Sequence, residues 1–201
     1  MDFEKLEKEF FKVKDDSLSF IRYFESNSDF IAKLDDNDEE QRGFKLKMNG
    51  DYGLSLAASG SPKKAVEVLE GFIPKFEKES GLDEDELSKT AYYEHLLWAF
   101  GSSLYYTDKI DETEKVFSRL VELQPENQKY KNWLRATKQK RYSRLRTILY
   151  VLLFAWIFVE IVFIKSMTSG LKMIFMMTGL GVICGTIILE AYLFFLKRKY
   201  Q

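Results

Sequence analysis

The sequence predicts an all-α fold in two parts, and three observations lead to it. Apolar residues in the first 126 positions recur at spacings of three and four, which is typical of amphipathic helices. No segment there alternates apolar and polar residues for long, so strands are not expected. Two apolar runs, residues 147–164 and 173–196, would form helices of about 27 and 36 Å, against a bilayer core of about 30 Å. We therefore expect a helical domain followed by a transmembrane helical hairpin.

The first 45 residues are predicted to form N-terminal amphipathic helices. One helix is expected over residues 2–13, and a second over about residues 18–34, with a break at Ser26–Ser28 as an alternative. Residues 35–40 (DDNDEE) form an acidic connector that can cap the next helix. That third helix is expected over about residues 39–59.

Glycine and proline residues delimit the helices that follow. Gly60 can end the third helix, and Pro62 suits the first turn of a fourth. Pro74 should kink that helix or end it early, because proline removes a backbone donor. A long aromatic helix is expected over about residues 84–106, and a further helix is expected to begin near Asp111 and to end before Pro125.

Two segments share one spacing. Gly53 to Ala65 and Gly101 to Thr113 each span twelve residues, with an expected turn between helices inside each interval. A small residue at either glycine position would let the paired helix approach closely. Over residues 46–134, including a capping helix, the chain resembles the tetratricopeptide repeat family, although its copies are offset by 48 residues rather than about 34. A generic helical bundle with coincidental glycines is the alternative.

The resemblance implies a concave surface lined by the first helix of each pair, where family members bind proteins or peptides. Here that surface would carry the following residues: His95, Trp98, Ser102, Tyr105, Tyr106 and Leu54, with Lys47 at its edge. Leu54 and Ser102 stand where carboxylate-binding members have asparagine, so an apolar or aromatic peptide is expected instead. In the alternative, the phenylalanine-rich N-terminal helices fill this groove.

Charge divides the chain into an acidic part and a basic part. Residues 1–126 hold 17 Lys/Arg and 29 Asp/Glu, whereas residues 127–201 hold 13 and 2. The juxtamembrane segment 135–146 is basic, and nothing in it breaks a helix that could continue into the bilayer. We expect an anionic-lipid collar there, and a topology signal without lipid binding is the alternative. The collar residues are Lys138, Lys140, Arg141, Arg144 and Arg146. Nucleic-acid binding is not expected, because the adjacent apolar run already explains the charge.

Both termini are expected on the cytoplasmic side. Basic residues precede the first apolar run and follow the second, which is the positive-inside pattern for two spans. The host membrane would be a bacterial inner membrane or a eukaryotic organelle membrane. The layout is loosely similar to that of the tail-anchored mitochondrial fission protein family, which has one span.

Folding the hairpin predicts contacts between its helices. Arg146 should lie beside Glu190 near the cytoplasmic interface, and Glu160 should lie near Lys165 at the other end. We favour such interfacial pairing over ion transport by these carboxylates. Gly181 and Gly185 allow close packing within the hairpin or between copies of the chain.

The sequence favours an interaction protein over an enzyme. His95 is the only histidine, and no phosphate-binding glycine loop, metal-ligand set or nucleophile–histidine arrangement is present, so no catalytic residue, cofactor or metal is expected. The favoured interpretation is a membrane-anchored adaptor or scaffold that binds a protein or peptide. The alternative is a membrane-shaping or assembly subunit that oligomerises through its transmembrane hairpin, and a transporter is a third interpretation.

Overall fold

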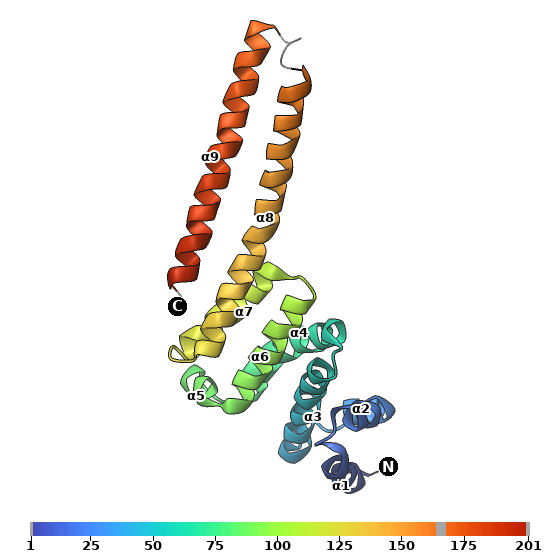
Figure 1. The fold of residues 1–201 in the computed structure, drawn as a ribbon. Helices are drawn as coiled ribbons and strands as arrows, with labels where there is room; N and C mark the ends of the chain where they lie inside the picture. The colour runs from blue at the N-terminus through green and yellow to red at the C-terminus, as the bar shows by residue number, and fades with distance from the viewer. Residues whose placement is uncertain (1, 164–167, 200–201) are drawn as a thin grey trace. The chain divides into compact units, whose positions relative to one another are not determined.

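The computed structural model describes residues 2–163 and 168–199, apart from a few side chains within the helices. These residues form helices and no strand, which confirms the all-α prediction. In chain order the helices are α1 (Phe3–Val13), α2 (Ser17–Ala32), α3 (Glu39–Ala58), α4 (Pro62–Glu79), α5 (Glu84–Lys89), α6 (Ala91–Tyr106), α7 (Ile110–Leu123), α8 (Gln128–Phe163) and α9 (Ser169–Lys199) (Figure 1). The chain forms two compact units, Met1–Tyr130 and Lys131–Gln201.

Two helix boundaries differ from an expected one. Helix α4 passes through Pro74 and ends at Glu79, so the proline does not end the helix early, and the neighbouring Phe72 and Ile73 are both buried against the core. The long aromatic helix is divided at Thr90, whose backbone is extended at φ −83° and ψ 113°. The Thr90 hydroxyl donates to the Glu86 carbonyl at 2.9 Å, which stabilises the end of α5. The alternative break in α2 at Ser26–Ser28 does not occur.

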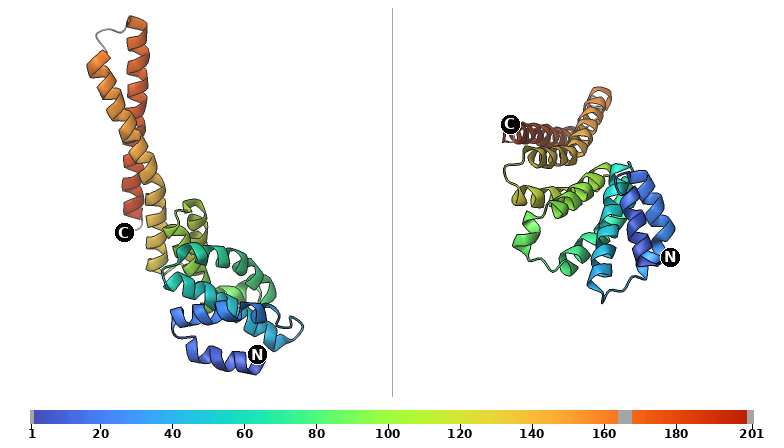
Figure 2. Two further views of the ribbon diagram at one scale, coloured as in Figure 1. Left: turned by 90° about the vertical axis from the view of Figure 1, so that its right-hand side faces the viewer. Right: turned by 90° about the horizontal axis from the view of Figure 1, so that it is seen from below.

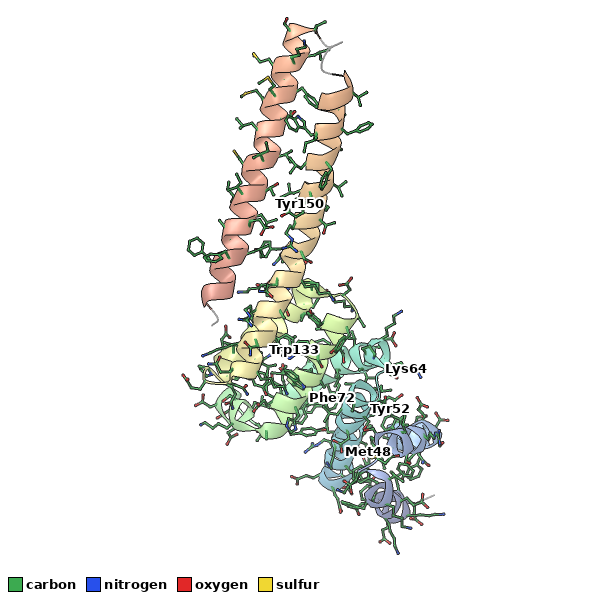
Figure 3. The ribbon with its side chains drawn as sticks, viewed as in Figure 1. Met48, Tyr52, Lys64, Phe72, Trp133 and Tyr150 are labelled. Carbon is green, nitrogen blue, oxygen red and sulfur yellow. The ribbon has the colours of Figure 1, made fainter. Side chains whose placement is uncertain are left out.

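The first three helices share an aromatic core. It consists of Leu6, Phe10, Phe20, Phe24, Ile31, Leu34, Phe44 and Met48, all buried. Tyr52 of α3 stacks on Phe24 of α2 with ring centroids 4.1 Å apart, and its hydroxyl donates to Glu25 at 2.9 Å. Figure 3 shows Met48 and Tyr52 on the side of α3 that faces α1 and α2. The N-terminal helices therefore pack against α3 as a further layer of the first unit.

Helices α3, α4, α6 and α7 form two pairs, and the turns within the two pairs have the same backbone hydrogen bonds. Helix α3 packs against α4, α6 packs against α7, and α4 and α3 both contact α6 (Figures 1 and 2). In the first turn Gly60 has a φ of +78°, and the Ser61 amide donates to the Leu56 carbonyl at 3.0 Å. In the second turn Asp108 has a φ of +70°, and the Lys109 amide donates to the Leu104 carbonyl at 3.0 Å.

The two glycines lie where the paired helices touch. A Cβ added to Gly53 would overlap the Leu69 side chain, with the Leu69 Cγ at 2.8 Å. A Cβ added to Gly101 would lie 3.0 Å from Val116 Cγ1 and 3.3 Å from the Phe117 ring. Leu69 and Phe117 are both fully buried. Gly53 and Gly101 are 48 positions apart, and so are Leu69 and Phe117. Equivalent residues therefore make the contact in the two pairs.

The second unit contains most of α8 together with α9, which runs antiparallel to it (Figures 1 and 2). The Trp156 indole donates to the Phe175 carbonyl at 3.0 Å, and the two rings stack at 5.4 Å. A Cβ added to Gly179 would overlap the Trp156 ring, so this glycine lets α9 approach the indole. Helix α8 is continuous from Gln128, as the sequence predicted.

Two helices of the described residues are long and apolar enough to span a membrane. The candidate spans lie within Gln128–Val159 and Ser169–Phe195, where 18-residue stretches reach mean hydropathies of 1.4 and 1.9. Their apolar side chains largely face outward, and Phe154 and Met173 are 70% and 69% exposed. Water-soluble proteins rarely expose so large an apolar surface without a function for it.

Candidate functional site

A pocket of about 350 Å³ lies between α3 and α6 on the inner faces of the two helix pairs. Its lining residues are Leu54, Ala57 and Ala58 of α3 and His95, Trp98, Ala99 and Ser102 of α6. The structure thus brings together four of the residues predicted for the groove. The two others, Tyr105 and Tyr106, pack edge to face on each other at 5.8 Å and do not line the pocket, and Tyr106 is 67% exposed.

Trp98 is the largest side chain of the pocket, and three neighbours hold it in place. Its ring lies edge-on to Phe117 at 5.7 Å and tilted against Tyr130 at 5.6 Å. The Lys129 ammonium lies 3.5 Å from the centroid of the indole, which is a close cation–π contact. Sequence reasoning placed Lys129 in the basic run but missed this contact, because the register of α8 on α6 has no local sequence signal.

A hydrogen-bond network fixes Tyr130 behind the tryptophan. The Tyr130 hydroxyl donates to Glu94 of α6, and the Gln124 side chain donates to the other oxygen of that carboxylate at 3.5 Å. Burial of the phenol, followed by its hydrogen bond to Glu94, raises the pKa of Tyr130 well above its usual value. The Tyr130 phenol behind the pocket therefore stays un-ionised and hydrogen-bonded at physiological pH.

The lysine expected at the edge of the groove is engaged by its neighbours. The Lys47 ammonium lies 3.1 Å from Asp51 and between the rings of Phe10 and Tyr92, at 5.7 and 5.8 Å. The Tyr92 hydroxyl donates to Asp51 at 3.1 Å, and burial raises the Tyr92 pKa far above its usual value. A Cβ added to Gly50 would overlap the Tyr92 hydroxyl, so this glycine admits the tyrosine to the network.

The N-terminal helices contact a different side of α3. They pack on Phe44, Met48 and Tyr52, whereas the pocket is lined by Leu54, Ala57 and Ala58. No residue from positions 2–45 lines the pocket between α3 and α6. The groove-filling alternative therefore does not describe this pocket.

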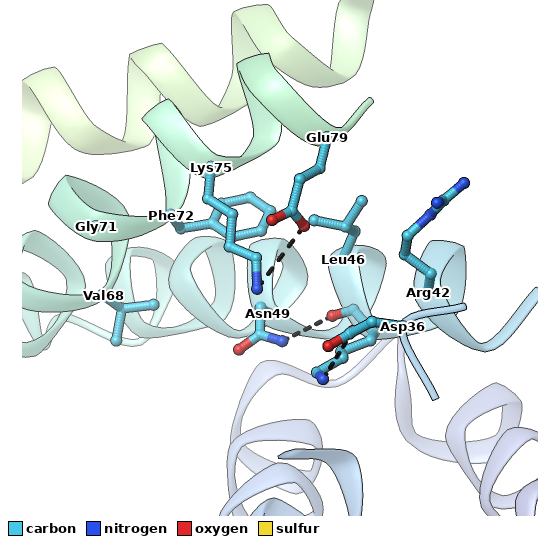
Figure 4. A pocket seen from close by; sticks show the side chains of 10 residues that line it. Asp36, Arg42, Leu46, Asn49, Val68, Gly71, Phe72, Lys75 and Glu79 are labelled. Carbon is cyan, nitrogen blue, oxygen red and sulfur yellow. Dashed lines mark hydrogen bonds and ion pairs between the residues drawn. The ribbon is translucent and has the colours of Figure 1, made fainter. Parts of the chain in front are cut away.

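A second hollow, of about 320 Å³, lies between α3 and α4, and half of its lining residues are charged (Figure 4). Lys45 is 2.9 Å from Asp36 and Lys75 is 3.8 Å from Glu79, while Asn49 donates to the Lys45 carbonyl at 2.7 Å. The hydrogen bond from Lys45 lowers the Asp36 pKa. Because these groups satisfy one another, the hollow offers a weaker site than the pocket at Trp98.

A third hollow, of about 360 Å³, lies between α4, α6 and α7 and has a largely apolar floor. The floor residues are Ile73, Pro74, Leu97, Phe100 and Val116. At its rim Arg119 binds Glu77 at 3.0 Å, and the Tyr93 hydroxyl donates to the same carboxylate at 2.5 Å. Sequence reasoning missed this hollow, because an apolar floor residue and a core residue give the same helical pattern.

The predicted hairpin residues lie as follows. Arg146 Nη1 is 3.8 Å from Glu190 Oε1, which also accepts a hydrogen bond from the Tyr150 hydroxyl at 2.9 Å. A Cβ added to Gly181 would meet nothing within 4 Å, and one added to Gly185 would lie 4.0 Å from Leu149. The closest approach of the two helices at a glycine is therefore at Gly179 rather than at either of these.

The collar residues Lys138, Lys140, Arg141 and Arg146 lie on α8 before or at the start of its apolar stretch. The side chain of Arg144 lies outside the described residues, as does the predicted pair of Glu160 and Lys165. Within the described part of the chain no cluster of three or more His, Cys, Asp or Glu side chains could hold a metal ion.

No protein-family model matches the chain, and neither a curated protein nor a solved structure matches it.

Proposed function

We propose that this chain is a membrane-anchored adaptor of tetratricopeptide-like architecture, and that it binds a protein or peptide in the pocket between α3 and α6. One observation carries the proposal: two helix pairs repeat the same turn and the same interhelical contact 48 residues apart, and a pocket opens on their first helices. In helical repeats the stacking of such pairs creates the concave surfaces used for binding.

The lining of the pocket defines the class of ligand. Leu54, Ala57 and Ala58 offer an apolar wall opposite the fixed indole of Trp98, while His95 and Ser102 offer polar groups. A volume of about 350 Å³ suits one large apolar or aromatic side chain with part of its backbone. The ligand is therefore a peptide segment with an apolar or aromatic anchor, and Trp98 is its main contact.

A matched pair of variants tests the pocket in the full-length protein. Leu54→Arg places a long cation in the apolar wall and should abolish partner capture in proximity labelling from the native membrane. Leu18→Arg, on α2 and 58% exposed in the wild type, adds the same charge elsewhere and should leave capture unchanged. Both proteins should melt within a few degrees of the wild type. Equal sets of labelled partners for all three proteins would contradict the pocket assignment.

The membrane part of the proposal rests on the outward-facing apolar surface of α8 and α9 and on the basic residues that flank it. We place both termini in the cytoplasm and the connection between the helices on the far side, with the collar facing anionic lipids. In a Cys184→Ser background, Ser169→Cys should react with an impermeant thiol reagent added from that far side. Reaction only after permeabilisation would reverse this topology.

An assembly subunit is the second candidate, because an added Cβ at Gly181 meets nothing within 4 Å. Such a bare position on an apolar helix allows close approach of a second copy. Gly181→Leu should then reduce the dimer fraction in detergent. Gly170→Leu, at another unobstructed position near the start of α9, should not reduce it. Equal dimer fractions in both variants would remove this candidate.

A further inference from the structure

A pocket of about 370 Å³ lies between α8 and α9 at the end of the hairpin where the apolar stretch of α8 begins. It is lined by Gln139, Ser143 and Arg146 of α8 and by Glu190, Leu193 and Phe194 of α9. Close to it the rings of Tyr142 and Tyr192 pack edge-on at 4.9 Å and fix the spacing of the two helices. All of these residues belong to the second unit.

The two walls of this pocket differ in polarity. Gln139, Ser143 and Arg146 precede the apolar run of α8, whereas Leu193 and Phe194 belong to the apolar run of α9. The apolar run of α9 is longer by six residues, so its last turns lie beside a polar segment of α8. A pocket with one polar and one apolar wall matches the boundary between lipid headgroups and acyl chains.

The two charges of the pocket are close but loosely paired. Arg146 Nη1 and Glu190 Oε1 are 3.8 Å apart, whereas a charge-assisted hydrogen bond measures about 2.7–2.9 Å. Glu190 instead accepts a hydrogen bond from the Tyr150 hydroxyl at 2.9 Å, and the Arg146 and Glu190 side chains remain 45% and 42% exposed. A guanidinium has five N–H donors, so Arg146 retains donors for a further anion.

We propose that this pocket binds the headgroup of a phospholipid that carries both a phosphate and a primary ammonium, such as phosphatidylethanolamine. Arg146 binds the phosphate, Glu190 accepts hydrogen bonds from the ammonium, and Leu193 and Phe194 contact the start of the acyl chains. The inference rests on the proposed insertion of the hairpin into a membrane. It differs from the anionic-lipid collar in its ligand, because the carboxylate selects a headgroup that is also a cation.

The carboxylate makes the headgroup preference testable. A quaternary choline has no N–H to donate to Glu190, and phosphatidylglycerol has no cation to place there. Successive N-methylation of the ethanolamine therefore removes donors without changing the phosphate or the acyl chains. The preference for the unmethylated headgroup should be about fivefold, which is the ratio that one partly exposed ion pair supports.

Native mass spectrometry of the full-length protein in detergent measures this preference. The lipids are phosphatidylethanolamine, its N-methyl and N,N-dimethyl derivatives, phosphatidylcholine and phosphatidylglycerol, all with the same acyl chains. The bound fraction should fall at each methylation step and be lower for phosphatidylglycerol. Soluble phosphoethanolamine at equal concentration should not displace the lipid, because it has no acyl chain. Displacement by it, or equal binding along the methylation series, would overturn the proposal.

Substitutions of Arg146 and Glu190 test their proposed contacts with the phosphate and the ammonium. Glu190→Gln keeps an acceptor for Tyr150 but removes the charge, so it should abolish the headgroup preference. Arg146→Gln should weaken binding of every phospholipid in the series. Lys172→Gln removes a charge at the other end of α9 and should behave as the wild type. A preference that survives Glu190→Gln overturns the assignment, and the wild-type series decides the matter if a variant does not fold.

A separate measurement distinguishes failure of the inference from failure of the proposed function. If the wild-type protein is extracted from its membrane by carbonate, the hairpin does not span the bilayer, and both proposals fail. If the protein resists extraction but binds ethanolamine and choline lipids equally, only the headgroup proposal fails.

Discussion

The pair α3–α4 and the pair α6–α7 have the same framework and different inner faces. The framework consists of the turn hydrogen bonds, the glycine at the interhelical contact and a buried residue opposite it. On the inner face, Gly50 of the first pair corresponds to Trp98 of the second, and Leu54 corresponds to Ser102. The shared positions hold each pair together, and the positions that differ shape the pocket.

The two inner faces differ because different side chains pack at Gly50 and at the equivalent Trp98. At Gly50 the absence of a side chain makes room for the Tyr92 hydroxyl from the next pair. At the equivalent Trp98 the indole fills the space beneath Lys129 and packs on Tyr130. At this position the first pair is therefore covered by Tyr92 from the second pair, whereas the second pair contributes a large aromatic side chain to the wall of the pocket.

The largest expected change in stability comes from substituting the two interhelical glycines, and it should differ between them. Gly53→Ala should destabilise the protein by about 2 kcal/mol, because the new methyl overlaps the body of a fully buried leucine, Leu69. Gly101→Ala should cost less than about 1 kcal/mol, since the nearest atom, Val116 Cγ1, is 3.0 Å away and alanine favours the helix. Chemical denaturation of both variants in detergent measures the difference.

Gly43→Ala provides the control for these two variants. Gly43 lies in α3 with nothing within 4 Å of an added Cβ, so alanine should stabilise the protein by about 0.5–1 kcal/mol. If Gly53→Ala were as stabilising as Gly43→Ala, then close packing at Gly53 would not hold the first pair together.

The same framework explains how much of the fold could be predicted. The glycine spacing indicated the paired helices, and Gly60 was a recognisable helix end. Its counterpart Asp108 was not recognised, because aspartate adopts a positive φ only occasionally and otherwise suits many positions. The break at Thr90 was missed for a similar reason, since a threonine that ends one helix and begins the next has no distinctive local sequence.

The pocket was predictable only in part. Leu54, His95, Trp98 and Ser102 follow from the resemblance to the repeat family, in which the first helix of each pair lines the inner surface, once the two helices are aligned by their glycines. The contact of Lys129 with Trp98, and the engagement of Lys47 by Asp51 and Tyr92, depend on how separate helices meet. Such long-range contacts are set by tertiary packing, and they leave no local pattern in a single sequence.

Substitutions in the two turns should give the next largest changes in stability. Gly60→Ala should destabilise the protein by about 1 kcal/mol, because its φ of +78° is unfavourable for a residue with a Cβ. Asp108→Gly should stabilise it by about 0.5 kcal/mol, because it relieves the same conformation at a φ of +70°. The two substitutions should therefore shift the melting temperature in opposite directions. A decrease in both would show that the Asp108 side chain contributes more to its turn than the left-handed backbone costs.

The smallest effect concerns Tyr52, which corresponds to Phe100 in the second pair. Burial of the phenol, together with its hydrogen bond to Glu25, raises the pKa of Tyr52 to about 12. A folded-state pKa above the unfolded value of about 10 stabilises the protein below pH 10, and this contribution is lost as the pH rises towards 12. Tyr52→Phe makes the first pair resemble the second and removes the titration.

The wild type should therefore lose stability more steeply than Tyr52→Phe between pH 10 and 12. The other tyrosines titrate in both proteins, so their contributions cancel in the difference between the two denaturation curves. Glu25→Gln keeps an acceptor for the hydroxyl but removes the negative charge that opposes ionisation, and its curve should lie between the other two. Parallel curves for the wild type and Tyr52→Phe would mean that the phenol ionises as easily in the folded protein as in the unfolded chain. The Tyr52 hydroxyl would then add nothing to the stacking of its ring on Phe24 within the core that α2 and α3 share.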